Sequence, residues 1–207
     1  MERAPLAIVW PCRLSVAEYA AAGKRIRVPR QACPDCGRTL TWWSGYWRWL
    51  RDQVVQRVWV RRGRCRTCRR SHALLPDLVH ERRLDTVEVI GSALASAVGG
   101  RGMRRVAAGI GVPTSTARDW RRRHRSRAPD LLARFAALAV RLGDDLADLP
   151  STLEAAVLAA LAAAWARARD RLSGIAASMW RFWNAICGGR ALGTNTSPRL
   201  GAARSSG

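Results

Sequence analysis

Residues 33–68, CPDCGRTLTWWSGYWRWLRDQVVQRVWVRRGRCRTC, begin and end on a Cys-x-x-Cys pair. Two residues between the cysteines of a pair allow both thiolates to face one ion, and two pairs supply the four tetrahedral ligands that structural zinc prefers. Gly37 follows the first pair and permits the positive φ that such a tight turn needs. The pattern predicts one structural Zn2+ with no coordination position open for catalysis. The expected ligands are Cys33, Cys36, Cys65 and Cys68.

The segment between the two pairs alternates aromatic and β-branched residues with arginine and glycine from Leu40 to Arg61. This two-residue period is typical of strands, so we expect a β-ribbon with the cysteine pairs at its base. Alternation places some of the tryptophans in a small core, which we expect to be the main use of the set, while others could stack on bases or on arginine. The tryptophans concerned are Trp42, Trp43, Trp47, Trp49 and Trp59.

Several residues around the ribbon could contact phosphate or ligate a metal. Arg69 and Arg70 follow the second cysteine pair and are expected to contact DNA phosphates. His72 and His80 could ligate a metal in principle, but with four cysteines already present we expect polar residues near the exit of the ribbon. The remaining cysteines, Cys12 and Cys187, lie far from either pair and are expected to be thiols outside the ligand set.

On the C-terminal side of the ribbon, residues 101–125 read RGMRRVAAGIGVPTSTARDWRRRHR. The apolar spacing indicates two short helices that are separated by a turn between Gly109 and Val112. Residues 85–98 carry an earlier helical pattern that ends at two glycines. Together these segments predict a three-helix, homeodomain-like helix-turn-helix whose last helix enters the major groove.

The last of these helices is expected to begin at Thr114, with Ala117, Trp120 and His124 on its buried side. The residues facing the bases would be Thr114, Ser115, Arg118, Asp119 and Arg122. Contacts to the DNA backbone are expected from Arg121, Arg123 and Arg125, because arginine pairs readily with phosphate. The alternative is an ordinary solvated basic helix after a glycine-rich turn.

The rest of the chain completes a fold class that is mainly α with a small β zinc ribbon. We expect a strand and a short helix within residues 1–30, the zinc ribbon over 31–84 and the helix-turn-helix over 85–127. Two amphipathic helices should form a hairpin over 128–187, packed within the chain or forming a homodimer. The last segment, 188–207, is expected to be a disordered basic tail.

The charge points to a polyanionic partner. The chain has 36 Lys and Arg against 15 Asp and Glu, a formal net charge of +21. Double-stranded DNA is therefore the first partner to expect. The sequence shows neither an apolar run long enough for a membrane span nor a signal-peptide pattern, so we expect a cytoplasmic protein with no membrane partner and reduced thiols.

Enzyme activity is not expected from the pattern of acids. A transposase of the DDE type needs three carboxylates on a ribonuclease-H-like sheet to hold two Mg2+ ions. After residue 127 the acids lie in helical or loop sequence with no strand pattern. Nucleophile and phosphate-loop signatures are likewise missing from the sequence.

Four segments resemble a group of small bacterial proteins of unassigned function that are encoded by or beside insertion sequences. The segments are CPDCG, RVWVRRGRCRTCRRSHALLP, RRVAAGIGVPTSTARDWRRRH and WRFWNAICGGRALGTNT, and the likeness covers about residues 30–195. A zinc ribbon followed by a helix-turn-helix also resembles the DNA-binding front end of several transposase families. Such recognition helices usually have Ser or Thr where Pro113 stands here, which affects the expected register of the helix.

The resemblance implies a non-catalytic, zinc-containing DNA-binding protein of a mobile element. It would recognise transposon-end or target DNA for a separately encoded transposase or recombinase and would be associated with the bacterial nucleoid. A transcription regulator and a protein-interaction adaptor are the alternatives that the same residues leave open.

Overall fold

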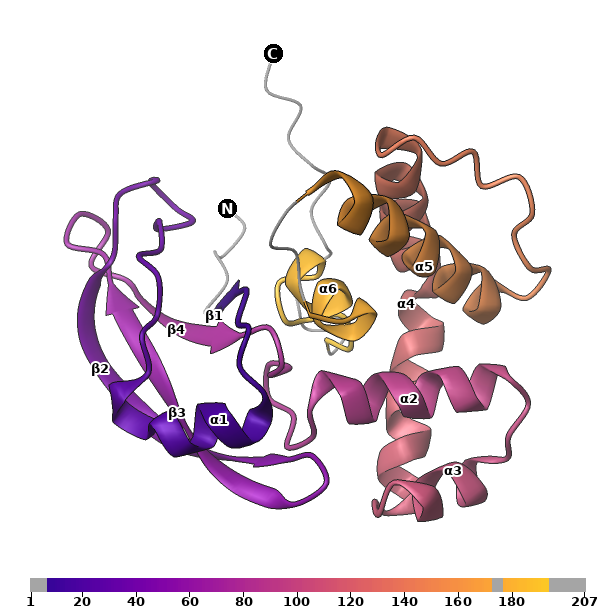
Figure 1. The fold of residues 1–207 in the computed structure, drawn as a ribbon, viewed down its shortest axis with the longest axis horizontal. Coiled ribbons are helices and arrows are strands. Elements are labelled where there is room, and N and C mark those ends of the chain that lie inside the picture. Colours follow the sequence, from indigo (N-terminus) through magenta and orange to yellow (C-terminus); the bar gives the residue numbers. More distant parts are fainter. Residues whose placement is uncertain (1–6, 173–176, 194–207) are drawn as a thin grey trace.

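The computed structural model describes residues 7–172 and 177–193, which form a sheet part and a helical part (Figure 1). The sheet has four strands in the order β1-β4-β3-β2. Strand β1 runs parallel to β4, whereas β3 is antiparallel to both β2 and β4. The strands are β1 (Ala7–Trp10), β2 (Thr41–Arg51), β3 (Val55–Arg64) and β4 (Ser71–Pro76).

Helix α1 (Val16–Ala22) packs against β3 and closes the core of the sheet part. Ser15 and Glu18 form a capping box, in which the Glu18 N–H donates to the Ser15 hydroxyl and the Ser15 N–H donates to the Glu18 carboxylate. A short 3-10 turn, Gly23–Arg25, follows the helix. Buried Tyr19 donates its hydroxyl hydrogen to the Trp59 carbonyl at 3.0 Å, which ties α1 to the ribbon.

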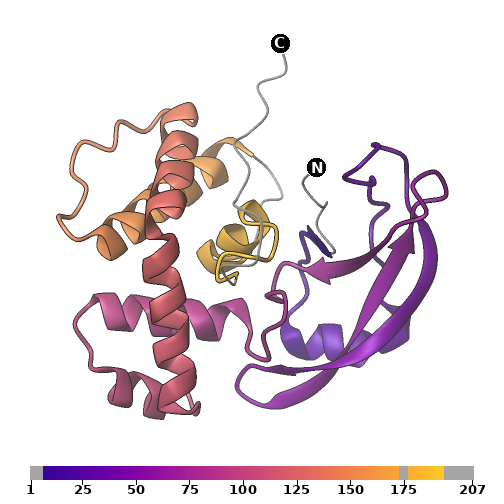
Figure 2. The ribbon, with the colours of Figure 1, turned by 180° about the vertical axis from the view of Figure 1, so that it is seen from behind.

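The described residues of the helical part form five helices that share one hydrophobic core. They are α2 (Val87–Val98), α3 (Met103–Gly109), α4 (Thr114–Arg141), α5 (Leu153–Arg171) and α6 (Met179–Ile186). Helix α4 runs the length of this part, with α2 and α3 beside its first half and α5 beside its second half (Figure 2). No described helix is long and apolar enough to cross a membrane.

The prediction of a mainly α fold with a small ribbon and a separate three-helix helix-turn-helix is wrong. Helix makes up 46% and strand 20%, because β1 and β4 extend the ribbon into a mixed sheet that has its own core. The expected recognition helix does not end near residue 127. Its buried stripe of Ala117, Trp120 and His124 continues into Leu131 and Phe135 at the same helical spacing, so a single helix of 28 residues runs along the one core of the helical part.

Pro129 lies inside this continuous helix, where it removes one backbone hydrogen-bond donor. Its side chain is exposed, and the residues on either side of it along the buried stripe, Ala128 and Leu131, are fully buried. Tertiary packing of the apolar stripe therefore outweighs the helix-breaking tendency of the proline.

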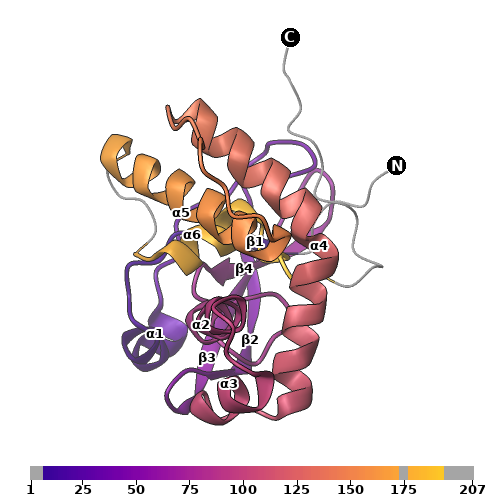
Figure 3. The ribbon, with the colours of Figure 1, turned by 90° about the vertical axis from the view of Figure 1, so that its right-hand side faces the viewer.

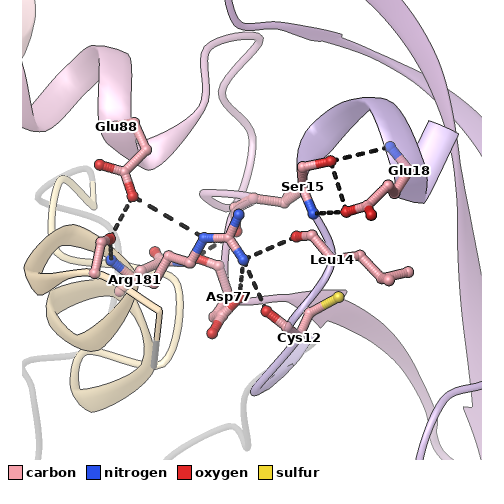
Figure 4. Close-up of polar contacts among 10 residues, drawn as sticks. Cys12, Leu14, Ser15, Glu18, Asp77, Glu88 and Arg181 are labelled. Atoms are coloured by element: carbon pink, nitrogen blue, oxygen red, sulfur yellow. Dashed lines mark hydrogen bonds and ion pairs between the residues drawn. The ribbon is translucent and has the colours of Figure 1, made fainter. Parts of the chain in front are cut away.

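Helix α6 joins the two parts, because it lies between the sheet and the α4–α5 pair (Figures 1 and 3). Buried Arg181 donates from Nη1 to the carbonyls of Cys12 at 2.7 Å and Leu14 at 3.0 Å (Figure 4). The same nitrogen lies 3.7 Å from the buried Asp77 carboxylate. Asn184, one turn later, donates to the carbonyls of Asp77 and Val79.

Residues 188–193, expected in a disordered tail, instead pack against this junction. Ala191 and Leu192 are fully buried, and the Leu192 N–H donates to His80 Nε2 at 3.2 Å. The backbone N–H of Glu81 donates to the Gly189 carbonyl at 2.9 Å. The remainder of that predicted tail, 194–207, lies outside the described residues.

Replacing Arg181 with methionine should destabilise the protein by about 3–5 kcal/mol, because it leaves the Asp77 carboxylate buried without a cation. The free energy of unfolding measured in urea would show the loss. Arg167→Met is the matched control, since it removes a more exposed ion pair with Asp144 and should cost less than about 1 kcal/mol. Equal losses for the two variants would contradict a central role for Arg181.

Stability should also depend on the protonation of Asp77. Burial raises the pKa of its carboxyl to about 6, although the Arg181 charge opposes the rise. A carboxyl whose pKa is higher in the folded than in the unfolded chain binds its proton more tightly when folded. Wild type should therefore gain stability relative to Asp77→Asn as the pH falls from 7 to 4. Unfolding curves measured in pairs at each pH test this, and a constant difference would refute it.

Candidate metal centre and basic surfaces

The four cysteines of the two pairs meet at the open end of the β2–β3 hairpin, as the sequence predicts. Thr41 pairs with Arg64 at that end, so the first pair lies just before β2 and the second just after β3. All four sulfurs lie within 4.8 Å of one another, and the Sγ atoms of Cys36 and Cys65 are 3.5 Å apart. Zinc–thiolate bonds of about 2.3 Å would place tetrahedral sulfurs about 3.8 Å apart. The cluster can therefore hold a metal ion.

The two cysteine turns repeat the same backbone geometry. The Cys33 N–H donates to the Arg38 carbonyl and the Cys65 N–H to the Arg70 carbonyl, each at 2.8 Å. The residue after the second cysteine of each pair has a positive φ, 71° at Gly37 and 58° at Arg69. Glycine adopts this conformation freely, whereas arginine adopts it at some cost. The second turn thus keeps its shape without the glycine that marks the first.

The four thiols differ in how readily they ionise. The Cys68 backbone N–H donates to the Cys65 sulfur at 3.3 Å, and this bond is the main reason that the pKa of Cys65 falls to about 7. The pKa of Cys68 rises to about 12, chiefly because of its hydrogen bond with Cys36. Four thiolates crowded together repel one another, so a bound cation is what allows all four to ionise.

His72 and Asp35 lie beside the cluster; the sequence indicates His72 as a possible ligand but not Asp35. The Nε2 atom of buried His72 is 3.9 Å from the Cys33 sulfur, and the ligand atoms of Cys33, Asp35 and His72 also lie within 4.8 Å of one another. Arg70 Nη1 donates to both oxygens of Asp35 at 3.2 Å. A predicted phosphate contact, Arg70, therefore already has a carboxylate partner within the chain. Cys12 and Cys187 are buried and stand apart from the cluster.

The basic residues at the start of α4 divide into paired and unpaired groups. Asp119, predicted to face bases, instead accepts from Arg122 and from Arg123 Nε at 2.6 Å, and lies 3.6 Å from Arg83 Nη1. Burial alone would raise the pKa of Asp119, but the arginines outweigh it and lower that pKa. The carboxylate is thus engaged within the chain.

Two of the predicted backbone contacts are also engaged internally. Arg121 Nε lies 3.3 Å from the Glu154 carboxylate, and Arg125 Nη2 lies 2.9 Å from it. Glu154 stands in the first turn of α5, so these ion pairs fix the start of α5 against α4. The N-cap of α5 is Thr152.

The unpaired group lies at the corner between α3 and α4. Thr114 begins α4, and Ser115 and Arg118 are exposed beyond it. Arg118 lines a shallow cleft of about 420 Å3 together with Arg104 and Arg105 of α3. Sequence reasoning missed these two α3 arginines, although their place opposite the buried Val106 and Ala107 could have indicated them. We call Arg104, Arg105 and Arg118 the arginine corner.

The tryptophans of the ribbon are mostly exposed, contrary to the expectation that the set mainly forms a core. Trp43 is 58% exposed, Trp49 56% and Trp42 48%. Arginine guanidinium groups lie over these rings: Arg64 is 4.5 Å from the centroid of Trp43, and Arg57 lies between Trp47 and Trp49 at 5.3 and 5.6 Å. The core is built instead from aliphatic residues such as Val58 and Val60.

Residues 33–120 match the family model described as a domain of unknown function, DUF6431. The matched range begins at the first cysteine ligand and ends at Trp120 in the first half of α4. No curated protein and no solved structure matches the chain.

Protein purified without chelator should contain one equivalent of metal ion per chain, measured by elemental analysis. Cys36→Ser or Cys65→Ser should remove the ion and unfold the region around residues 30–75, because metal binding in small modules supplies much of the folding free energy. Hydrogen exchange would show fast amides there and protected amides in α4 and α5. Cys12→Ser should retain the metal, and protection unchanged by loss of the four-cysteine site would contradict a structural role.

Proposed function

We propose that the protein is a non-catalytic, zinc-containing protein that binds double-stranded DNA. We further propose that it belongs to a mobile element and recognises transposon-end or target DNA for a separately encoded transposase. The observation that carries the DNA-binding proposal is the arginine corner, where three exposed guanidinium groups line one cleft.

Zinc is the metal that the donor set favours. Four cysteine sulfurs in a compact cluster suit a soft, tetrahedral ion, and structural zinc sites with four thiolates leave no position for water or substrate. The ion would hold the base of the hairpin together and take no part in chemistry. The cluster thus supports a non-catalytic role for the metal.

The charge around the arginine corner fits the phosphates of duplex DNA. Among the described residues, no carboxylate forms an ion pair with Arg104, Arg105 or Arg118, whereas nearby Arg121, Arg123 and Arg125 each pair with Glu154 or Asp119. Unpaired arginines attract the phosphate backbone strongly, and binding releases counterions from the DNA.

The start of α4 adds a second source of attraction at the same place. Pro113 is its N-cap and offers no side-chain acceptor to the first-turn N–H groups. Such groups favour phosphate oxygens, as does the positive end of the helix dipole. Thr114 and Ser115, in that first turn, can donate hydroxyl hydrogens to the same oxygens. Arg118, one turn further on, can reach guanine O6 and N7 in the major groove.

Arg118→Ala should cost about 1–3 kcal/mol on a preferred duplex selected from a random pool, with a smaller loss on a scrambled duplex. Arg69→Ala, if that exposed arginine touches only phosphate, should weaken binding to both duplexes equally and reduce the slope of log affinity against log salt by about 0.9. Titrations across a salt series measure both quantities.

Arg141→Ala is the matched control for Arg118→Ala. Arg141 is exposed on the same helix but lies about 35 Å along it, so its removal changes the charge equally without touching the arginine corner. The proposal fails if Arg118→Ala and Arg141→Ala lose the same affinity on every duplex. Binding would then depend on the net charge alone and not on the arginine corner.

A further inference from the structure

One face of the β2–β3 ribbon gathers exposed tryptophans and arginines into a single row. Trp42 pairs with Gly63, Trp47 with Trp59, and Trp49 with Arg57. Because these β3 partners are separated by even numbers of residues, all of them lie on the same face of the strand. Arg61, between Trp59 and Gly63, shares that face and lies over Trp42 at 5.5 Å. We call this row the Trp–Arg face.

Contacts within the chain fix the shape of the Trp–Arg face. A Cβ on Gly45 would lie 2.4 Å from the Trp59 ring, so the ring lies directly over the backbone of that glycine. Trp59 packs edge-on against Trp47 at 5.3 Å between centroids. Arg61 donates to the carbonyls of Ile26 and Lys24, which fixes its guanidinium beside the row. The face is therefore ordered before any partner arrives.

Large aromatic rings in this position need an explanation beyond packing. Trp42 and Trp49 keep about half of their surface exposed even though arginines already contact them. Neighbouring Trp43, in the β-bulge between Trp42 and Ser44, is the most exposed of the three. Exposed apolar surface gathered in one patch marks interaction sites in soluble proteins.

The charge of the ribbon indicates which kind of partner would bind this face. Residues 41–64 contain six arginines and one acid, Asp52, which lies in the hairpin turn and accepts a hydrogen bond from Thr86. A protein partner with an apolar surface would have to bury Arg57 and Arg61 without countercharge, which is costly. A polyanion with flat aromatic groups satisfies both the rings and the guanidinium groups.

We propose that the Trp–Arg face binds a single strand of DNA, with unpaired bases stacked on the exposed indoles and phosphates contacted by the arginines. Stacking needs bases whose flat faces are free, which a duplex does not offer along its length. This inference rests on the proposed function and refines it: the substrate is duplex DNA with a single-stranded end or an opened segment. The duplex binds the arginine corner, and the unpaired strand binds the ribbon.

The position of the two surfaces fits such a substrate. Strand β2 is an edge strand of the sheet, and its beginning lies on the side away from α4 and α5 (Figure 1). The arginine corner lies in the helical part, on α3 and the start of α4. The two surfaces therefore occupy different parts of the molecule and need not compete for one strand.

The test compares a labelled 20-nucleotide oligothymidine strand with a 20-base-pair duplex, titrated by fluorescence anisotropy against the metal-loaded full chain. Trp42→Leu and Trp49→Leu should each weaken single-strand binding roughly 5- to 100-fold. Trp49→Phe should lose less than Trp49→Leu, because phenylalanine keeps a ring for stacking. All of these variants should leave duplex binding within about twofold of wild type, since the duplex contacts the arginine corner.

Arg57→Ala provides a measurement that does not depend on removing an indole. It should flatten the salt dependence of single-strand binding by about 0.7 in the log–log slope, whereas Arg141→Ala should not. Circular dichroism and metal content identify any variant that fails to fold, and Arg57→Ala then decides the outcome in its place.

The outcomes separate this inference from the proposed function. The inference is overturned if wild type binds the duplex but not oligothymidine, or if Trp42→Leu, Trp49→Leu and Arg57→Ala all bind the strand as wild type does. It is also overturned if these variants abolish self-association or binding to an acidic protein instead, which would make the face a protein interface. Single-strand binding that is lost in these variants, without any duplex binding, supports the face and refutes the duplex proposal.

Discussion

The guanidinium of Arg181 connects segments that are far apart in the chain, and the relative position of the two parts depends on it. It contacts the loop after β1, the carboxylate that follows β4, and Glu88 in α2 at 4.0 Å. A buried charge without partners is strongly unfavourable. The contacts from all three segments together offset the cost of burying the Arg181 guanidinium, so each segment must be in place. Since α6 carries Arg181, the helical core and the sheet assemble around one charge.

The contacts of Arg181 explain why the sequence alone does not decide what the aromatic residues of α6 pack against. In the sequence, Trp180, Phe182 and Trp183 surround one arginine, a pattern that is compatible both with capping a helical core and with binding a partner. The choice depends on Asp77 and on carbonyls more than a hundred residues earlier in the chain. Local patterns carry no information about such long-range pairing, and the burial of residues 188–193 was missed for the same reason.

Features set by short-range geometry were predictable. The capping box at Ser15, the β-ribbon and the meeting of the two cysteine pairs at its base all follow from spacings of a few residues. The buried side of α4 was also correct at Ala117, Trp120 and His124. The predictions that were wrong concern which surfaces meet. The mixed sheet was missed because β1 pairs with β4 across more than sixty residues. Asp119 was expected to face bases, and short-range patterns did not show that Arg83 lies 3.6 Å from it in addition to Arg122 and Arg123 of its own helix.

Pro129 gives α4 a mechanical property that follows from its position. A helix of 28 residues is about 42 Å long and behaves as a stiff rod. The proline removes one bond of the ladder between the basic end and the half that packs against α5, and bending of long helices concentrates at such points. Helix α5 braces this point, because Glu154 in its first turn pairs with Arg121 and Arg125 on the N-terminal side of the proline, while the rest of α5 packs against the half that follows it.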